Sequence, residues 1–323
     1  MHFNTFARLK MSNVKINIIN KLHLGKKTLA WGILIILMLI WGTSFILIKR
    51  GLEVFSSEIV GALRIVVSFL VLLPFAISRL QKVPVDKWKY IALIGILGTG
   101  IPSFLFAKAQ TVLGSSLAGI LNSLTPLFTL IIGLSFFRQK SRWQNILGVF
   151  IGLAGAVGLI AATSGASLSF QFSYAFLIII ATIFYALQSN ILKYYLNEIP
   201  PVTIASIGFF VIGIPVGIYL FFFTNFTWAV VHQENGLEGV FYVALLGIFS
   251  SAFAIILYNK LVQMTNAVFA SSVTYFVPVI ALIWGTFDGE KFPLISVLFI
   301  TMIILGVFLV NRNGQKKDFK EKE

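Results

Sequence analysis

Ten long apolar segments follow one another along the chain, separated by short polar stretches. A transmembrane helix needs roughly 20 apolar residues, because each residue advances the helix by about 1.5 Å through a hydrocarbon core about 30 Å thick. The pattern therefore predicts an all-α integral membrane protein with ten transmembrane helices. The expected helices cover residues 28–48, 56–78, 89–108, 113–137, 143–162, 173–195, 201–223, 238–260, 267–287 and 292–311.

The second half of the chain repeats features of the first. The heptapeptide YIALIGI begins at Tyr90, and YVALLGI begins at Tyr242, 152 residues later. The same offset relates Pro126 to Pro278, and an offset of 144 suits the first helix of each half. Matches spread over whole halves indicate a duplicated unit rather than one shared local motif.

The duplication predicts two five-helix units, at residues 28–162 and 173–311, with tails at 1–27 and 312–323. Because five is an odd number, the second unit must start on the side of the membrane opposite to the first. Units placed in this way are related by a two-fold axis in the membrane plane. This is the inverted-repeat plan of many secondary transporters, in which the substrate site lies between the repeats.

The net charge of +14 is distributed unevenly across the predicted membrane. With the N-terminus in the cytoplasm, 20 of the 25 lysines and arginines fall in cytoplasmic segments. This bias predicts cytoplasmic termini and makes lipid headgroups expected partners, whether the chain starts at Met1 or at Met11. Nucleic acid is not an expected partner, because the charges occupy separate short loops. Lys49 and Lys193, at the ends of equivalent helices, are expected to snorkel or to contact a helix C-terminus.

Composition agrees with a lipid environment and narrows the chemistry. Hydrophobic residues make up 58% of the chain and charged residues 11%, whereas soluble domains carry roughly 25% charged residues. The chain has no cysteine, and its three histidines lie in polar stretches without metal-ligand spacing. We therefore expect neither a metal nor a cofactor. Abundant Ile, Phe, Lys and Asn are typical of AT-rich bacterial genomes and favour a bacterial inner membrane.

Several motifs resemble those of the EamA-type branch of the drug/metabolite transporter superfamily. They are Trp41-Gly42-Thr43-Ser44-Phe45, Ala62-Leu63-Arg64, the stretches Ser115–Gly133 and Ala270–Gly285, and Gly289-Glu290. The resemblance implies ten helices in inverted repeats and transport of small metabolites, commonly export of amino acids or related compounds. The family's Gly-Glu pair after the fourth helix is replaced by Arg138-Gln139, so a role for that glutamate does not carry over.

Two prolines are predicted to break membrane helices at equivalent places. A proline cannot donate to the carbonyl four residues earlier, so Pro126 would free the carbonyl of Asn122. Pro278 would free that of Thr274 in the same way. Free backbone groups at membrane depth are tolerated only where they face protein or a wet cavity. We therefore predict that these residues line a substrate pathway; the alternative is a packing kink satisfied by a neighbouring hydroxyl.

Arg64 is predicted to lie within the second span, about 12 Å from its start near Ser56. A charge at this depth is costly and marks a functional site by default. The planar guanidinium suits a carboxylate or a phosphate in bidentate geometry. The alternative is a fixed ion pair with Glu53, Glu58 or Glu290.

The first helix of each unit supplies further candidates. Trp41 and Ser44 lie one helical turn apart. Tyr185 and Gln188 repeat this spacing in the second unit, and Asn190 follows closely. An aromatic face beside hydrogen-bonding groups suits a small polar metabolite, whereas simple packing is the alternative for each aromatic. Weaker candidates are Tyr258, Asn259 and Tyr275.

No aspartate or glutamate falls in the middle of a predicted span. A buried carboxylate is the usual proton relay or cation ligand, so we expect a neutral, zwitterionic or anionic substrate. The sequence also lacks the carboxylate clusters, HExxH motif or Ser/His/Asp set of a membrane enzyme. We therefore predict a permease for a small-molecule metabolite, an exporter that works by alternating access. A flippase for lipid-linked sugars and an uptake carrier are the alternatives, and the sequence leaves the oligomeric state open.

Overall fold

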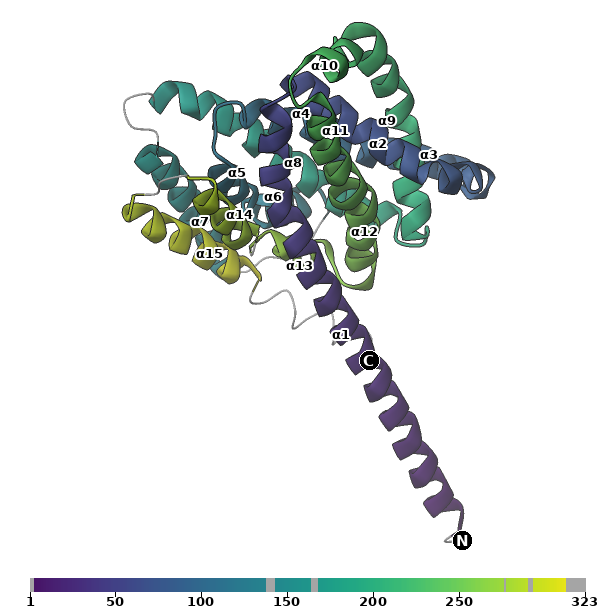
Figure 1. The fold of residues 1–323 in the computed structure, drawn as a ribbon. Coiled ribbons are helices and arrows are strands. Elements are labelled where there is room, and N and C mark those ends of the chain that lie inside the picture. The colour runs from purple at the N-terminus through teal and green to yellow at the C-terminus, as the bar shows by residue number, and fades with distance from the viewer. Residues whose placement is uncertain (1–2, 138–142, 164–167, 276, 290–292, 312–323) are drawn as a thin grey trace.

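The elements of the fold are helices throughout the described residues of the computed structural model, which are 3–137, 143–163, 168–275, 277–289 and 293–311 (Figure 1). The α-helices are α1 (Phe3–Leu52), α2 (Ser57–Ile77), α3 (Val85–Gly95), α4 (Ile101–Ala109), α5 (Ser115–Asn122), α6 (Thr125–Phe136), α7 (Trp143–Thr163), α8 (Leu168–Tyr195), α9 (Pro201–Phe223), α10 (Phe226–His232), α11 (Gly236–Leu245), α12 (Ala254–Met264), α13 (Ala267–Ser271), α14 (Val277–Phe287) and α15 (Ile295–Asn311). The described residues also form the 3₁₀ turns η1 (Leu80–Lys82) and η5 (Ser272–Tyr275) and the π-helices η2 (Ile96–Gly100) and η4 (Leu246–Phe253).

Eight stretches of the described residues are helical, long and apolar enough to cross a membrane. They coincide with eight of the ten predicted spans, from Thr28–Leu52 to Ala267–Phe287. At the other two predicted positions the structure forms α7 and the 17-residue helix α15. The multi-pass membrane character expected from the hydrophobic pattern is confirmed. Arg138-Gln139, Glu290 and the tail 312–323 lie outside the described residues.

The bundle is apolar on its outside, and its largely hydrophobic interior also contains buried polar side chains. Phe136, Phe222 and Phe287 are 75%, 80% and 82% exposed, respectively. Ser68, by contrast, is fully buried in α2, and its hydroxyl donates to the carbonyl oxygens of Arg64 and Gly247. A water-soluble protein covers its large apolar side chains, so this surface suits lipid.

The third span of each half contains a π-helical segment. The helix formed by α3, η2 and α4 runs from Val85 to Ala109, and its counterpart formed by α11, η4 and α12 runs from Gly236 to Met264. The two repeated heptapeptides lead into these segments, which begin at Ile96 and Leu246. A π-helix replaces the regular hydrogen-bond ladder by bonds to the fifth residue, and such segments are frequent at functional sites.

The fourth span of each half is broken. In the first half, α5 ends at Asn122 and α6 begins at Thr125, with Pro126 in its first turn. In the second half, α13 passes through η5 before α14, which contains Pro278 near its start. Proline is tolerated in a first turn because its missing N–H has no partner there. The predicted helix breaks at both prolines are confirmed.

Helices that are distant in sequence form the edges of the bundle (Figure 1). The most extensive helix packing is between α7 and α15 at one edge, and α2 packs on α9 at the opposite edge. The N-terminal part of α1 projects away from the bundle (Figure 1). Residues 3–27, expected as a tail, thus continue the first span as one helix.

Glycines bring helix backbones into close contact at two related places. A Cβ atom at Gly95 would lie 2.9 Å from the carbonyl oxygen of Gly208, where α3 meets α9. A Cβ atom at Gly247 would lie 2.9 Å from the carbonyl oxygen of Arg64, where η4 meets α2. Gly95 and Gly247 are 152 residues apart, and Arg64 and Gly208 are 144 apart. The repeat offsets therefore relate the two contacts to each other.

Candidate functional site

A central cavity lies where the two halves of the chain meet, and its empty volume is about 700 Å³ when the adjoining open solvent is included. Its wall combines aromatic rings, aliphatic side chains and small polar groups. The lining residues are Trp41, Ser44, Phe45, Ile48, Arg64, Gly98, Thr99, Ser103, Phe106, Asn122, Thr125, Tyr185, Gln188, Ser250, Ser251, Ile255, Tyr258, Ser271 and Thr274. A concave site with an apolar wall and a few polar groups is the usual form of a small-molecule site.

The structure brings together seven of the ten residues predicted to form the pathway. These residues are Trp41, Ser44, Arg64, Asn122, Tyr185, Gln188 and Thr274. The weaker candidate Tyr258 joins them. Pro126, Pro278 and Asn190 are not among the lining residues.

The carbonyl of Asn122 is bonded within its own turn. The Thr125 hydroxyl donates to it at 2.7 Å. The carbonyl that Pro126 cannot bond is therefore satisfied by a neighbouring hydroxyl, which was the alternative to a free carbonyl. It is the polar side chains at the helix break, those of Asn122 and Thr125, that line the cavity.

Asn190 holds two helices together. Its side-chain amide donates to the carbonyl oxygen of Thr129 in α6 at 3.0 Å and to that of Ala186 in α8 at 2.9 Å. The side chain is 1% exposed. Its predicted place in the pathway is not supported by this geometry, because its side-chain amide donates to its own helix and to α6.

An aromatic wall is fixed to both halves by hydrogen bonds. The Trp41 indole donates to the carbonyl oxygen of Ser250 at 3.0 Å, and its ring lies 5.2 Å from that of Tyr258. The Tyr258 hydroxyl lies 2.6 Å from the Ser189 hydroxyl. Tyr185 stacks on Phe106 at 5.9 Å. Rings held by neighbours at both ends form a pre-organised surface, which lowers the entropy lost on binding.

Arg64 contacts the second half of the chain in the wall of the cavity. Its Nε donates to the Ser251 hydroxyl at 2.6 Å. Glu53 pairs with Arg50, and Glu58 lies 3.8 Å from Lys108. The alternative of a fixed ion pair with either glutamate is therefore wrong, and Glu290 lies outside the described residues.

The small hydroxyl residues of the cavity were missed by the sequence analysis. Ser250 and Ser251 lie in the π-helix of the second half, at positions equivalent to Gly98 and Thr99 in the first. All four line the cavity. Single serines carry little information in a membrane helix, but the repeat offset applied to each helix would have placed them on one face.

Gln188 occupies the space beside Gly98. A Cβ atom at Gly98 would lie 2.4 Å from the side-chain carbonyl carbon of Gln188. The absence of a side chain on the π-helix η2 therefore lets the amide lie against the backbone. Gln188 is 3% exposed, so it is buried and still borders the cavity.

A smaller pocket of about 260 Å³ adjoins the cavity and shares Thr99, Gln188 and Ile255 with it. Asn259 also lines this pocket, and it is 1% exposed. Neither side-chain polar atom of Asn259 has a hydrogen-bond partner among the described residues. A buried amide without partners is destabilising and needs a reason for its presence.

We expect Asn259→Leu to raise the melting temperature of the purified protein. An unpaired buried amide costs about 1–3 kcal/mol, which leucine removes at similar volume. Asn190→Leu is the matched control. It should lower the melting temperature, because that amide donates two hydrogen bonds. A drop in melting temperature for Asn259→Leu would contradict the prediction.

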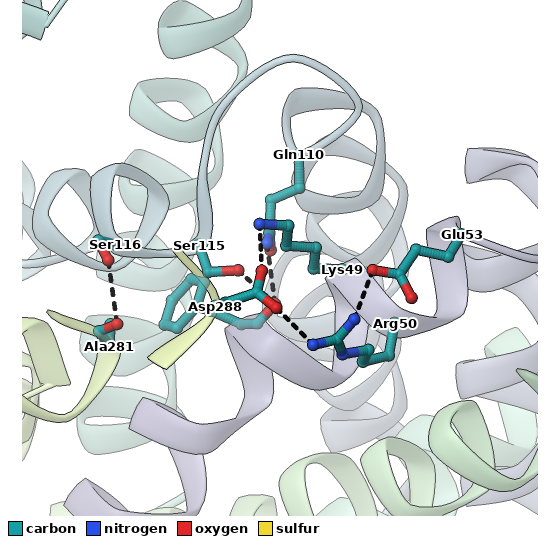
Figure 2. A network of polar contacts seen from close by, with 9 residues as sticks. Lys49, Arg50, Glu53, Gln110, Ser115, Ser116, Ala281 and Asp288 are labelled. Carbon is teal, nitrogen blue, oxygen red and sulfur yellow. Dashed lines mark hydrogen bonds and ion pairs between the residues drawn. The ribbon is translucent and has the colours of Figure 1, made fainter. Parts of the chain in front are cut away.

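A charged network follows the cavity-lining Ile48 in sequence (Figure 2). Ile48 lines the cavity, and the two residues after it, Lys49 and Arg50, both pair with Asp288 at the end of α14. Arg50 also donates to Glu53 at 2.8 Å. The network ties α1 to α14, so the Lys49 side chain lies in an ion pair rather than simply snorkelling.

Hydrogen bonds to backbone carbonyls tie the equivalent helix of the second half. Lys193, the counterpart of Lys49, donates to the carbonyl oxygens of Gln263 and Thr265 at 3.1 and 2.7 Å. These carbonyls end α12, so the expected contact with a helix C-terminus is confirmed for Lys193. The position equivalent to Asp288 is Phe136, so the carboxylate that pairs with α1 has no counterpart there.

Comparison with known proteins agrees with this geometry. The EamA-like transporter family matches the chain twice, over residues 29–161 and 172–312. The inner membrane transporter YedA of Escherichia coli K12 is 29% identical over 284 residues, covering 87% of this chain and 90% of YedA. A transporter of Archaeoglobus fulgidus is 24% identical, covering 87% of this chain and 98% of its own length.

A solved crystal structure shares the fold. It superposes with a TM-score of 0.63 at 15% sequence identity, covering 89% of this chain and 98% of that protein. The coverage includes both halves of the helix bundle.

Proposed function

Because the chain belongs to the EamA-like transporter family, within the drug/metabolite transporter superfamily, we propose that it exports a small polar metabolite, such as an amino acid or a related compound, by alternating access. The protein is a multi-pass membrane transporter. The observation that carries the proposal is the central cavity, to which both halves contribute aromatic and polar side chains.

The proposed architecture is a pair of inverted five-helix repeats. Three structural correspondences support it: the π-helices in both third spans, the breaks in both fourth spans, and the two related glycine contacts. With α7 and α15 as the fifth helices, the second repeat would run opposite to the first. Alternating access would then exchange two similar conformations around a fixed site.

The proposed orientation places both termini in the cytoplasm of a bacterial inner membrane. The excess of lysine and arginine in the predicted cytoplasmic segments supports it. In this orientation the network of Lys49, Arg50 and Asp288 lies at the outer end of the cavity.

Efflux from proteoliposomes tests the function. Vesicles containing the purified protein are loaded with labelled amino acids, their acyl derivatives and nucleosides, and the release of each compound is compared with protein-free vesicles. We expect at least one of these solutes to leave faster from the vesicles with protein. Flip-flop of a fluorescent lipid in the absence of any solute flux would instead assign the protein to lipid transport.

Asp288→Asn is expected to open the outer end of the cavity. Loss of the carboxylate removes the ion pairs that join Lys49 and Arg50 of α1 to the end of α14, which favours separation of the two helices. The chain has no cysteine, so Ser44→Cys provides a single reactive group in the cavity. An impermeant maleimide added outside should label this cysteine about ten times faster in the Asp288→Asn background.

Glu53→Gln is the matched control for the outer network. It removes only an ion pair whose side chains are 39% and 49% exposed, and such pairs contribute little. The labelling rate should stay close to that of the parent. Equal rates in the parent and Asp288→Asn would mean that the network does not close the cavity.

A further inference from the structure

The cavity contains a single fixed charge. Among the described residues that line it, Arg64 is the only ionisable group that is charged at neutral pH. No carboxylate in the described ranges forms an ion pair with Arg64, and Glu53 and Glu58 pair with other bases. Arginine does not deprotonate in proteins, so the cavity keeps a net charge of +1 until a ligand compensates it.

The Arg64 guanidinium is held in place by one hydrogen bond from its Nε atom. Its Nε donates to Ser251, which fixes the plane of the group from the opposite half of the chain. Backbone packing fixes the base of the side chain, because Gly247 approaches the Arg64 carbonyl and Ser68 donates to it. The two terminal nitrogens are the groups that bind a carboxylate with two parallel hydrogen bonds.

Resting on the proposed function, we infer that the cargo is a small monoanionic carboxylate, held by the Arg64 guanidinium, and that it crosses the membrane as a net charge of −1. One carboxylate cancels the single charge of the cavity lining, which is otherwise without a counter-ion among the described residues. A zwitterion adds an ammonium group that finds no carboxylate among the described lining residues. A phosphate monoester carries about −1.5 to −2 charges and leaves an excess negative charge.

The charge of the cargo determines the direction of transport. Arg64 stays in the protein, so each transported anion moves one negative charge across the membrane. A membrane potential that is negative inside expels this charge, with an equilibrium gradient of roughly 50-fold per 100 mV. Export would then be driven by the potential itself, in agreement with the lack of acidic residues in the middle of the spans. The argument holds for either orientation of the protein.

Binding of matched compounds tests the charge preference. The melting temperature of the purified full chain is measured with N-acetylphenylalanine (−1), phenylalanine (zwitterion), N-acetylphenylalaninamide (uncharged) and phenyl phosphate. The same measurement is made with the N-acetyl acid, the free amino acid and the N-acetyl amide of leucine and of glutamine. For at least one of these three amino acids, the N-acetyl acid should raise the melting temperature more than the other compounds do. Stabilisation that is greatest for the zwitterion, the amide or the phosphate would overturn the inference, as would the absence of stabilisation by every acid.

Variants of the Arg64 contact separate binding from folding. Arg64→Gln should lose the preference for the acid over the amide, and Arg64→Lys should keep the preference with about tenfold weaker binding, because lysine lacks the planar fork. Ser251→Ala keeps the charge and tests the positioning contact, with a severalfold loss of affinity. An unchanged acid preference in folded Arg64→Gln would overturn the inference. If Arg64→Gln does not fold, the result for Arg64→Lys decides.

The potential dependence is measured in proteoliposomes. Vesicles are loaded with the labelled N-acetyl acid that gives the largest stabilisation, and a potassium gradient with valinomycin sets the potential. Efflux should accelerate when the inside is negative, and the final gradient should approach roughly 50-fold per 100 mV. Transport of amino acids without any response to the potential would overturn the inference while the proposed function stands. If no solute moves in any vesicle, both fail.

Discussion

Replacing Gly98 with leucine is expected to reduce transport more than tenfold in a protein that still folds. A Cβ atom at this position would lie 2.4 Å from the side chain of Gln188. The new side chain and the displaced amide would both take up room in the cavity, where a bound solute needs it. The amide can move because it is the end of a flexible side chain, so the melting temperature should change little. Initial efflux rates at equal protein content measure the effect.

Gly100→Ala is the control for this substitution in the same π-helix. A Cβ atom at Gly100 would meet its nearest neighbour, the Gly95 carbonyl oxygen, at 3.5 Å, which is ordinary contact. Transport should remain close to that of the parent. Gly98→Ala provides a milder second variant in case the leucine side chain prevents folding. Full transport in both Gly98 variants would show that Gln188 and Gly98 do not border the route of the solute.

The second large effect is expected at the contact between α7 and α15. A Cβ atom at Gly306 would lie 2.5 Å from both the Gly148 carbonyl oxygen and the Gly152 amide nitrogen. Because both neighbours are backbone atoms, Gly306→Leu cannot be accommodated by rotating a side chain. We expect the most extensive helix contact of the bundle to separate, with a loss of about 3 kcal/mol or more in the free energy of unfolding.

Thermal unfolding of the detergent-purified protein measures this loss as a lower melting temperature. Gly152→Ala is the matched control on the partner helix, because its Cβ atom would meet only the Leu127 side chain, at 3.6 Å. That variant should melt close to the parent. A melting temperature of Gly306→Leu equal to that of Gly152→Ala would show that the two helices do not pack as tightly as the structure indicates.

The helices of this protein were predictable because lipid leaves the chain few choices. Backbone groups in a bilayer must pair within the chain, so apolar stretches of sufficient length form helices wherever they occur. The eight described spans follow the hydrophobic pattern, and both helix breaks lie at the prolines that the sequence places there. The ends of the helices differ, as at Val85–Ala109, where the predicted span was 89–108.

The use of each polar side chain was harder to predict. Asn190 and Gln188 are two residues apart in the same helix, yet one joins α8 to α6 and the other borders the cavity. The Asn122 carbonyl, expected to be free, is bonded by the Thr125 hydroxyl. The hydrogen-bond partner of each polar group depends on which donors and acceptors lie one turn away or on another helix. Neither the hydropathy nor the spacing of residues along the sequence predicts these partners.

By itself, the sequence determined the helical membrane architecture, the duplication and the presence of a charge at Arg64. These follow from the lengths of the apolar stretches, from the matched positions in the two halves and from the residue type within the second span. Tertiary structure decided that Ser251, 187 residues away, holds this charge, and that Glu53 and Glu58 do not. The reason is physical: hydrogen bonds and ion pairs act over a few ångströms, and the partners within that range are set by how helices from the two halves pack.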